Sequence, residues 1–151
     1  MKPKPSILHI EPYKPGRAMV QGFERPLKLS ANENALGCSE RAREAYLSAA
    51  GNLSLYPDPR ANALRAALAE RHKLDPERII FGTGSDELFA MACQAYLQAG
   101  DVIVQPQYAF AAWAIAARAA GGGVVSAPEK QFRVDVDAML AAVDSRTRLA
   151  F

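Results

Sequence analysis

The sequence predicts an α/β protein, in which helices cover both faces of a mostly parallel, incomplete sheet and an extended arm precedes the sheet. Three observations support this fold class. Apolar segments of strand length alternate with segments of helix length from residue 79 onward. The run at residues 102–104 is short, apolar and unalternating, as in a strand buried on both faces. The chain stops inside another apolar run, so we expect the sheet to continue beyond it.

Residues 1–37 form the expected arm. Prolines interrupt any helix there, because proline lacks the backbone N–H and clashes with the preceding turn. A short strand is possible at residues 27–29. The prolines of this segment are Pro3, Pro5, Pro12, Pro15 and Pro26.

Residues 38–151 form the expected partial domain, truncated at its C-terminal end, and it opens with two helices. Ser39 can cap a helix over residues 40–50, which Gly51 would end. Asp58 followed by Pro59 favours a second helix that begins at the proline.

Strands and helices then alternate to the end of the chain. Asp135 is suited to cap the last helix, and the glycines at 100 and 121–123 are suited to end the two helices before it. We expect strands at residues 79–81, 102–104, 124–125 and 149–151, and helices over residues 85–97, 110–120 and 136–143.

The segment Gly82-Thr83-Gly84-Ser85-Asp86-Glu87 joins the expected strand at 79–81 to a helix. Glycines let the backbone turn tightly and approach a ligand. The free N–H groups and positive dipole end of the helix then favour an anion. A simple helix cap, with Ser85 as the capping residue and acids in the first turn, would explain the polar residues but would not require both glycines.

Two common phosphate motifs do not match this turn. A dinucleotide site needs a third glycine, where Glu87 stands, and an acid after the second strand, where Gln105 and Pro106 stand. A P-loop needs a Gly-Lys-Ser or Gly-Lys-Thr run, which does not follow the turn. The turn therefore favours a smaller phosphate ester, and a nucleotide-binding module remains an alternative.

Composition argues against several other classes. The net charge is +2 with scattered basic residues, so we expect no nucleic-acid surface. No apolar run approaches the ~18 residues of a membrane span, and we expect no membrane partner. The cysteines, Cys38 and Cys93, and the histidines, His9 and His72, match no metal spacing. We expect a cytoplasmic protein with free thiols and no metal.

An ordered set of short segments through nearly the whole chain resembles the pyridoxal-phosphate-dependent aminotransferases of fold type I, and specifically the histidinol-phosphate aminotransferase family. The set is specific because chance would have to supply every member in order. The segments are Tyr13-Lys14-Pro15-Gly16, Leu29-Ser30-Ala31-Asn32-Glu33-Asn34, Leu36-Gly37, Tyr56-Pro57-Asp58-Pro59, Gly82-Thr83-Gly84-Ser85-Asp86-Glu87 and Pro106-Gln107-Tyr108.

The resemblance implies pyridoxal 5′-phosphate as the cofactor. Gly84, Ser85 and Asp86 would hold its 5′-phosphate, in agreement with the helix-end argument. Tyr108 would stack on the pyridine ring from the loop after the second strand, although it could also pack simply on the sheet edge.

The resemblance also implies a homodimer when the protein is full length. Tyr56 would reach across the dimer interface to the cofactor phosphate of the other subunit, although a packing residue before the Asp58 cap is the simpler interpretation of the residue alone. Tyr13 and Asn34 would lie on the substrate side.

The implied activity is the transfer of an amino group between histidinol phosphate and 2-oxoglutarate, which gives imidazole acetol phosphate and glutamate in histidine biosynthesis. A pyridoxal enzyme also needs a Schiff-base lysine. In the family this lysine follows the position of Phe151, so we expect no catalytic residue in this chain and no activity of the chain alone. Its lysines, none in a matching context, are Lys2, Lys4, Lys14, Lys28, Lys73 and Lys130.

Two small departures from the family occur, Ala35 in place of a usual proline and Thr83 in place of a common asparagine. Neither removes a catalytic group. An aromatic-amino-acid aminotransferase or a related pyridoxal-dependent decarboxylase remains an alternative, as does an inactive fragment.

Overall fold

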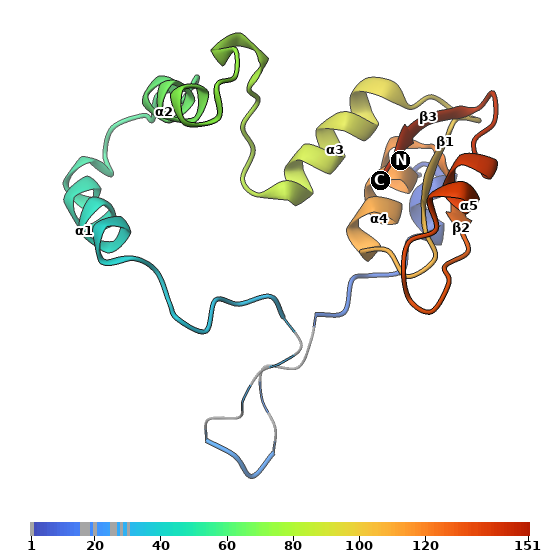
Figure 1. The fold of residues 1–151 in the computed structure, drawn as a ribbon, viewed down its shortest axis with the longest axis horizontal. Coiled ribbons are helices and arrows are strands. Elements are labelled where there is room, and N and C mark those ends of the chain that lie inside the picture. Colours follow the sequence, from blue (N-terminus) through green and yellow to red (C-terminus); the bar gives the residue numbers. More distant parts are fainter. Residues whose placement is uncertain (1, 16–18, 20, 25–26, 28, 30) are drawn as a thin grey trace. The chain divides into compact units, whose positions relative to one another are not determined.

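The computed structural model describes residues 2–15, 19, 21–24, 27, 29 and 31–151. It divides into two compact units, one made of Met1–Tyr13 with Phe81–Phe151 and the other of Lys14–Ile80 (Figure 1).

The first unit contains a three-stranded parallel sheet in the order β2-β1-β3. Strand β1 (Val102–Pro106) lies in the centre, and every residue in it is buried. Strands β2 (Gly123–Ala127) and β3 (Thr147–Ala150) flank it. The predicted buried parallel strand is therefore confirmed.

Helices cover both faces of this sheet, as predicted. Helix α4 (Ala111–Ala120) joins β1 to β2, and α5 (Val136–Ala141) joins β2 to β3. Because β2 and β3 lie on opposite sides of β1, right-handed crossovers place α4 and α5 on opposite faces (Figure 1). Helix α3 (Ser85–Tyr96) packs against α4 and contacts β3.

The core of the unit lies between the sheet and helices α3 and α4. Cys93 and Leu97 from the end of α3 meet Ile103 of β1 and Ala117 of α4, and all four are buried. Burial raises the pKa of the Cys93 thiol, so this cysteine stays protonated and packs as a small apolar residue. A short 3₁₀ turn, η1 (Pro5–His9), contacts α4 from the N-terminal segment.

The second unit contains helices α1 (Glu40–Ala49) and α2 (Asn62–His72), with short 3₁₀ turns η2 (Ala50–Asn52) and η3 (Pro76–Arg78). The predicted Ser39 cap is confirmed, since its Oγ accepts a hydrogen bond of 3.2 Å from the N–H of Ala42.

Two sequence predictions differ from the structure. Residues 79–81 form no strand, and the Ile79 carbonyl instead accepts a hydrogen bond from the Arg65 guanidinium. Helix α2 begins at Asn62 rather than at Pro59. The Asp58 carboxylate accepts from the N–H groups of Arg60 and Asn62 and closes a local turn there.

The left-handed conformation of Ala61, at φ 47°, separates that turn from the helix. The strand considered at 27–29 includes residue 28, which lies outside the described residues. No helix in the described ranges has the length and apolar character needed to cross a bilayer.

Candidate functional site

The glycine turn before α3 has a backbone conformation that only glycine adopts readily. Gly84 has φ 88° and ψ 177°, and its N–H donates a 2.8 Å hydrogen bond to the Gly82 carbonyl. A Cβ at Gly84 would meet no atom within 4 Å, so steric crowding is not the reason for a glycine at this position. The backbone conformation requires it.

The start of α3 differs from the starts of α1 and α5. Ser39 caps α1 and Asp135 caps α5, each through its side chain. Gly84 occupies the cap position of α3, where no side chain accepts from the first N–H groups, and Ser85 is the first helical residue. Ser85 therefore is not the cap, and its hydroxyl and the first-turn N–H groups remain available to an anion.

Glu87 completes the turn from inside the helix, a role that sequence analysis missed. Its Oε2 accepts from the Thr83 N–H at 2.6 Å and from the Thr83 hydroxyl at 2.9 Å. A Cβ on Gly82 would lie 3.2 Å from the same oxygen. The available signal was an acid three residues after the cap position, as in a capping box.

The Thr83 N–H, and then its hydroxyl, lower the pKa of the Glu87 carboxyl from its ordinary value of 4.5. A carboxyl whose pKa is lower in the folded state stabilises the turn fully above the ordinary pKa, and the effect is lost as the pH falls through the lowered value. We expect the Thr83 amide chemical shift to follow this titration, with a midpoint below 4.5. In Glu87→Gln the shift should stay constant, because the amide oxygen accepts without titrating. A Thr83 shift that still titrates in this variant would show that another group controls the turn.

Tyr108 lies in the loop between β1 and α4. Its N–H donates a 3.1 Å hydrogen bond to Oε1 of Glu129, which follows β2. Its ring lies 5.4 Å from the ring of Phe132, and 63% of the residue is exposed. The loop is thus held by its backbone, while much of the ring is open to a ligand.

The structure brings Tyr13 to the same loop. Its ring meets that of Phe110 edge to face, with the centroids 5.6 Å apart and the planes at 82°. Phe110 is the cap residue of α4, two positions after Tyr108.

An aromatic cluster of Phe89, Trp113 and Phe151 joins the elements around this edge. Phe89, in the second turn of α3, lies 5.5 Å from Phe151 at the carboxyl end of β3. Trp113, near the start of α4, stacks on Phe151 at 5.4 Å and lies 5.7 Å from Phe89. The starts of α3 and α4 therefore lie at the carboxyl ends of the strands, where open α/β sheets bind ligands.

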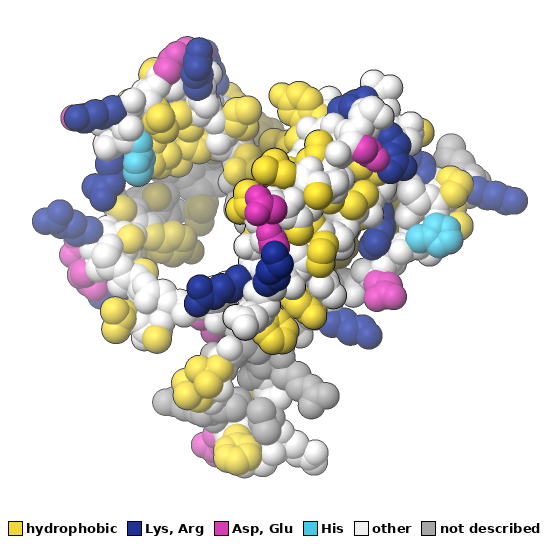
Figure 2. Space-filling model, turned by 45° about the vertical axis from the view of Figure 1, so that its right-hand side comes forward, with side chains coloured by type: hydrophobic (Ala, Val, Ile, Leu, Met, Phe, Trp, Pro, Cys, Tyr) yellow, Lys and Arg dark blue, Asp and Glu magenta, His cyan; other side chains and the backbone are white. Residues whose placement is uncertain are grey.

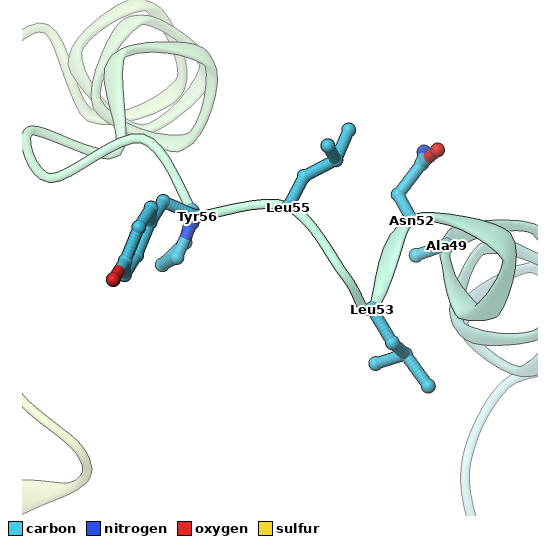
Figure 3. A pocket seen from close by; sticks show the side chains of 6 residues that line it. Ala49, Asn52, Leu53, Leu55 and Tyr56 are labelled. Atoms are coloured by element: carbon cyan, nitrogen blue, oxygen red, sulfur yellow. The ribbon is translucent and has the colours of Figure 1, made fainter.

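The second unit contains the other two predicted residues. The side chain of Asn34 is engaged in its own turn, where Oδ1 accepts from the Leu36 N–H and Nδ2 donates to the Gly37 carbonyl. Tyr56 is fully exposed and borders an open hollow of about 600 Å³. Figure 3 shows Tyr56 and Leu53 on one side of the connecting segment, and Leu55 and Asn52 on the other.

The charged residues suggest no further site. Within the described ranges, no three or more His, Cys, Asp or Glu side chains are placed to hold a metal ion. On the face in Figure 2, Lys and Arg side chains are interspersed with acidic and apolar ones.

Comparisons of this chain with known proteins agree on one family. The family model described as aminotransferase class I and II matches residues 24–150. Histidinol-phosphate aminotransferase 1 of Caulobacter vibrioides is 54% identical over 149 residues, which are 99% of this chain and 42% of that protein. The histidinol-phosphate aminotransferase of Maricaulis maris is 49% identical over the whole chain and is again covered over 42% of its length. The chain thus spans about two fifths of these relatives.

Solved structures agree with the sequence relatives. The histidinol-phosphate aminotransferase from Sinorhizobium meliloti, in complex with pyridoxal-5′-phosphate, has a TM-score of 0.73 at 29% identity, with 77% of this chain and 32% of that chain covered. The aromatic aminotransferase from Pyrococcus horikoshii has a TM-score of 0.64 at 29% identity, with 73% and 33% covered. The family match over most of the chain, and the agreement of sequence with fold, establish that this chain belongs to the class I and II aminotransferases.

Proposed function

We propose that this chain is the cofactor-anchoring N-terminal part of a pyridoxal-phosphate-dependent histidinol-phosphate aminotransferase. The observation that carries the proposal is the 54% identity, over 149 residues, to an enzyme of that name. Identity at this level over almost the whole chain favours the same substrate class.

The donors at the start of α3 fit the phosphate of this cofactor. A phosphate ester needs N–H and O–H donors and a positive electrostatic environment. In our proposal, Ser85 and Asp86 supply backbone N–H groups, the Ser85 hydroxyl adds a donor, and the α3 dipole adds the field. The Glu87 carboxylate, which would repel a phosphate, is already engaged by Thr83.

Tyr108 would hold the other end of the cofactor. A partly exposed aromatic ring at the carboxyl edge of the sheet can stack on a pyridine ring and fix its plane. When bound, pyridoxal 5′-phosphate supplies the electron sink for amino transfer, and this part of the chain supplies position and orientation. We assign no lysine of this chain as the Schiff-base residue.

The remaining roles are also proposals. Tyr13 and Asn34 would lie toward the substrate, and Tyr56 would reach the phosphate held by the other subunit of a homodimer. Residues 1–37 would act as an arm, and residues 38–151 as part of the large, cofactor-binding domain. The substrates would be histidinol phosphate and 2-oxoglutarate, and the compartment the cytoplasm.

The test uses the complete gene product that contains this chain, loaded with pyridoxal 5′-phosphate. We expect amino transfer from histidinol phosphate to 2-oxoglutarate with a kcat/KM at least tenfold above that for phenylalanine or tyrosine. A preference for the aromatic amino acids would favour the activity named for the Pyrococcus horikoshii neighbour. Release of CO₂ in place of amino transfer would indicate a decarboxylase.

The 151-residue chain alone is expected to give no turnover. Incubation with pyridoxal 5′-phosphate, borohydride reduction and mass spectrometry should show no stoichiometric label on a single lysine. Such a label, accompanied by transaminase turnover, would contradict the assignment of the reactive lysine outside this chain.

A further inference from the structure

A tight turn after β2 has an unusual sequence for its conformation. Lys130 and Arg133 exchange two backbone hydrogen bonds, of 3.1 and 3.0 Å, around a two-residue loop. Both loop residues have positive φ, 53° for Gln131 and 58° for Phe132. Asn-Gly and Asp-Gly are the usual residues of such a turn, and a bulky side chain there is a conformational outlier.

The turn is held at both ends, so it cannot easily relax to remove the strain. On one side, Glu129 accepts from the Tyr108 N–H. On the other side, Lys130 forms an ion pair with Asp135, the residue that caps α5. The strained residues therefore sit in a loop that links the segment after β1 to the start of α5.

Burial does not explain the phenylalanine at this position. Phe132 remains 82% exposed, so little apolar surface is removed from water. The aromatic contact that it makes is with Tyr108, at 5.4 Å between centroids and 38° between planes. A glycine at residue 132 would relieve the unfavourable conformation, and this contact is what it would lose.

We propose that Phe132 is a positioning residue that orients the Tyr108 ring for a bound pyridine ring. Glu129 fixes the backbone of Tyr108, and Phe132 supports one part of its ring while the rest stays open. In this proposal, the contact of Phe132 with the Tyr108 ring is the reason that a phenylalanine is kept in an unfavourable backbone conformation. This inference rests on the proposed function of Tyr108. It adds Phe132, a loop residue, to the residues that position the cofactor.

The test compares two glycine substitutions in the complete gene product that contains this chain. Phe132→Gly and Gln131→Gly each remove a side chain from a positive-φ position of the same turn, but only the first removes the contact with Tyr108. The probe is pyridoxamine 5′-phosphate, which has no aldehyde and so reports non-covalent contacts. Calorimetric titration of the apoprotein gives its Kd.

We expect Phe132→Gly to raise the Kd roughly two- to tenfold, the range of one aromatic pair. Gln131→Gly should leave the Kd unchanged, and both variants should keep their thermal midpoints or raise them. Phe132→Tyr should restore binding, because it keeps the ring and the exposed hydroxyl reaches water.

Tyr108→Ala separates this inference from the function on which it rests. If Tyr108→Ala weakens binding and Phe132→Gly matches Gln131→Gly, the positioning role is wrong and the stacking role stands. If Tyr108→Ala has no effect, the proposed function of Tyr108 fails as well. In the double variant, a loss equal to that of Tyr108→Ala alone supports action through Tyr108, whereas additive losses would overturn it.

Discussion

Replacing Gly84 by alanine is expected to lower the free energy of unfolding by roughly 1–3 kcal/mol and to weaken the binding of a phosphate ester at least about tenfold. The physical reason is backbone conformation alone. At φ 88° and ψ 177° a residue with a Cβ is strongly disfavoured, while the space around the position is open. Relief of the strain requires a change in φ at residue 84, and this change alters the orientation of the following peptide, whose Ser85 N–H is a proposed phosphate donor, relative to the rest of the turn.

Gly51→Ala is the matched control for this prediction. Gly51 does not have positive φ, and a Cβ added there would also meet no atom within 4 Å, so its replacement should change stability by no more than about 0.5 kcal/mol. Urea titration gives the stabilities, and calorimetry with pyridoxamine 5′-phosphate and with pyridoxamine separates the contribution of the phosphate. If both variants lost affinity for the two probes equally, the turn would not hold the phosphate.

The sequence could predict helix caps that depend on neighbouring residues and strands that show a clear hydrophobic pattern. The Ser39 and Asp135 caps depend on side chains bonding to N–H groups two or three residues away. The apolar run of β1 marks a strand buried on both faces wherever it lies in a parallel sheet. Alternation of such runs with helices then indicated the fold class.

Elements that depend on distant partners could not be predicted in the same way. Residues 79–81 have the composition of a strand, but a strand also needs a partner strand in register, and here the Ile79 carbonyl accepts from the distant Arg65 guanidinium instead. The start of α2 was shifted by the Asp58 carboxylate, which closed a turn where a helix was expected. Local propensity contains neither piece of information.

In the candidate site too, features set by local sequence could be predicted and features set by tertiary contacts could not. The glycine turn was evident because its conformation needs particular residues. The bond from Thr83 to Glu87, the packing of Tyr13 on Phe110 and the contact of Phe132 with Tyr108 come from tertiary structure. Sequence alone identified Tyr13 and Tyr108 through family resemblance, and it gave no reason to single out Phe132.

Replacing Trp113 by alanine is expected to lower the free energy of unfolding by about 3–5 kcal/mol, the usual cost of removing a large aromatic from a packed cluster. The Trp113 ring stacks on Phe151 and meets Phe89 edge to face, so its loss opens a cavity where α3, α4 and β3 meet. Because this cluster holds the start of α3 at the carboxyl edge of the sheet, binding of pyridoxamine 5′-phosphate should weaken as well.

Trp113→Phe should have a different outcome, which separates ring packing from hydrogen bonding. The indole Nε1 is buried without a hydrogen-bond partner among the described residues, so removing it relieves a desolvation cost. We expect this variant to keep wild-type stability to within about 1 kcal/mol, since it retains an aromatic ring in the cluster. Tyr96→Ala, at a residue of α3 that is 65% exposed, is the control for loss of an aromatic outside the cluster. Urea titration gives the stabilities of the three variants. A loss in Trp113→Phe as large as in Trp113→Ala would show that a phenyl ring cannot replace the indole in this cluster, and it would contradict the expected gain from removing the unpaired N–H.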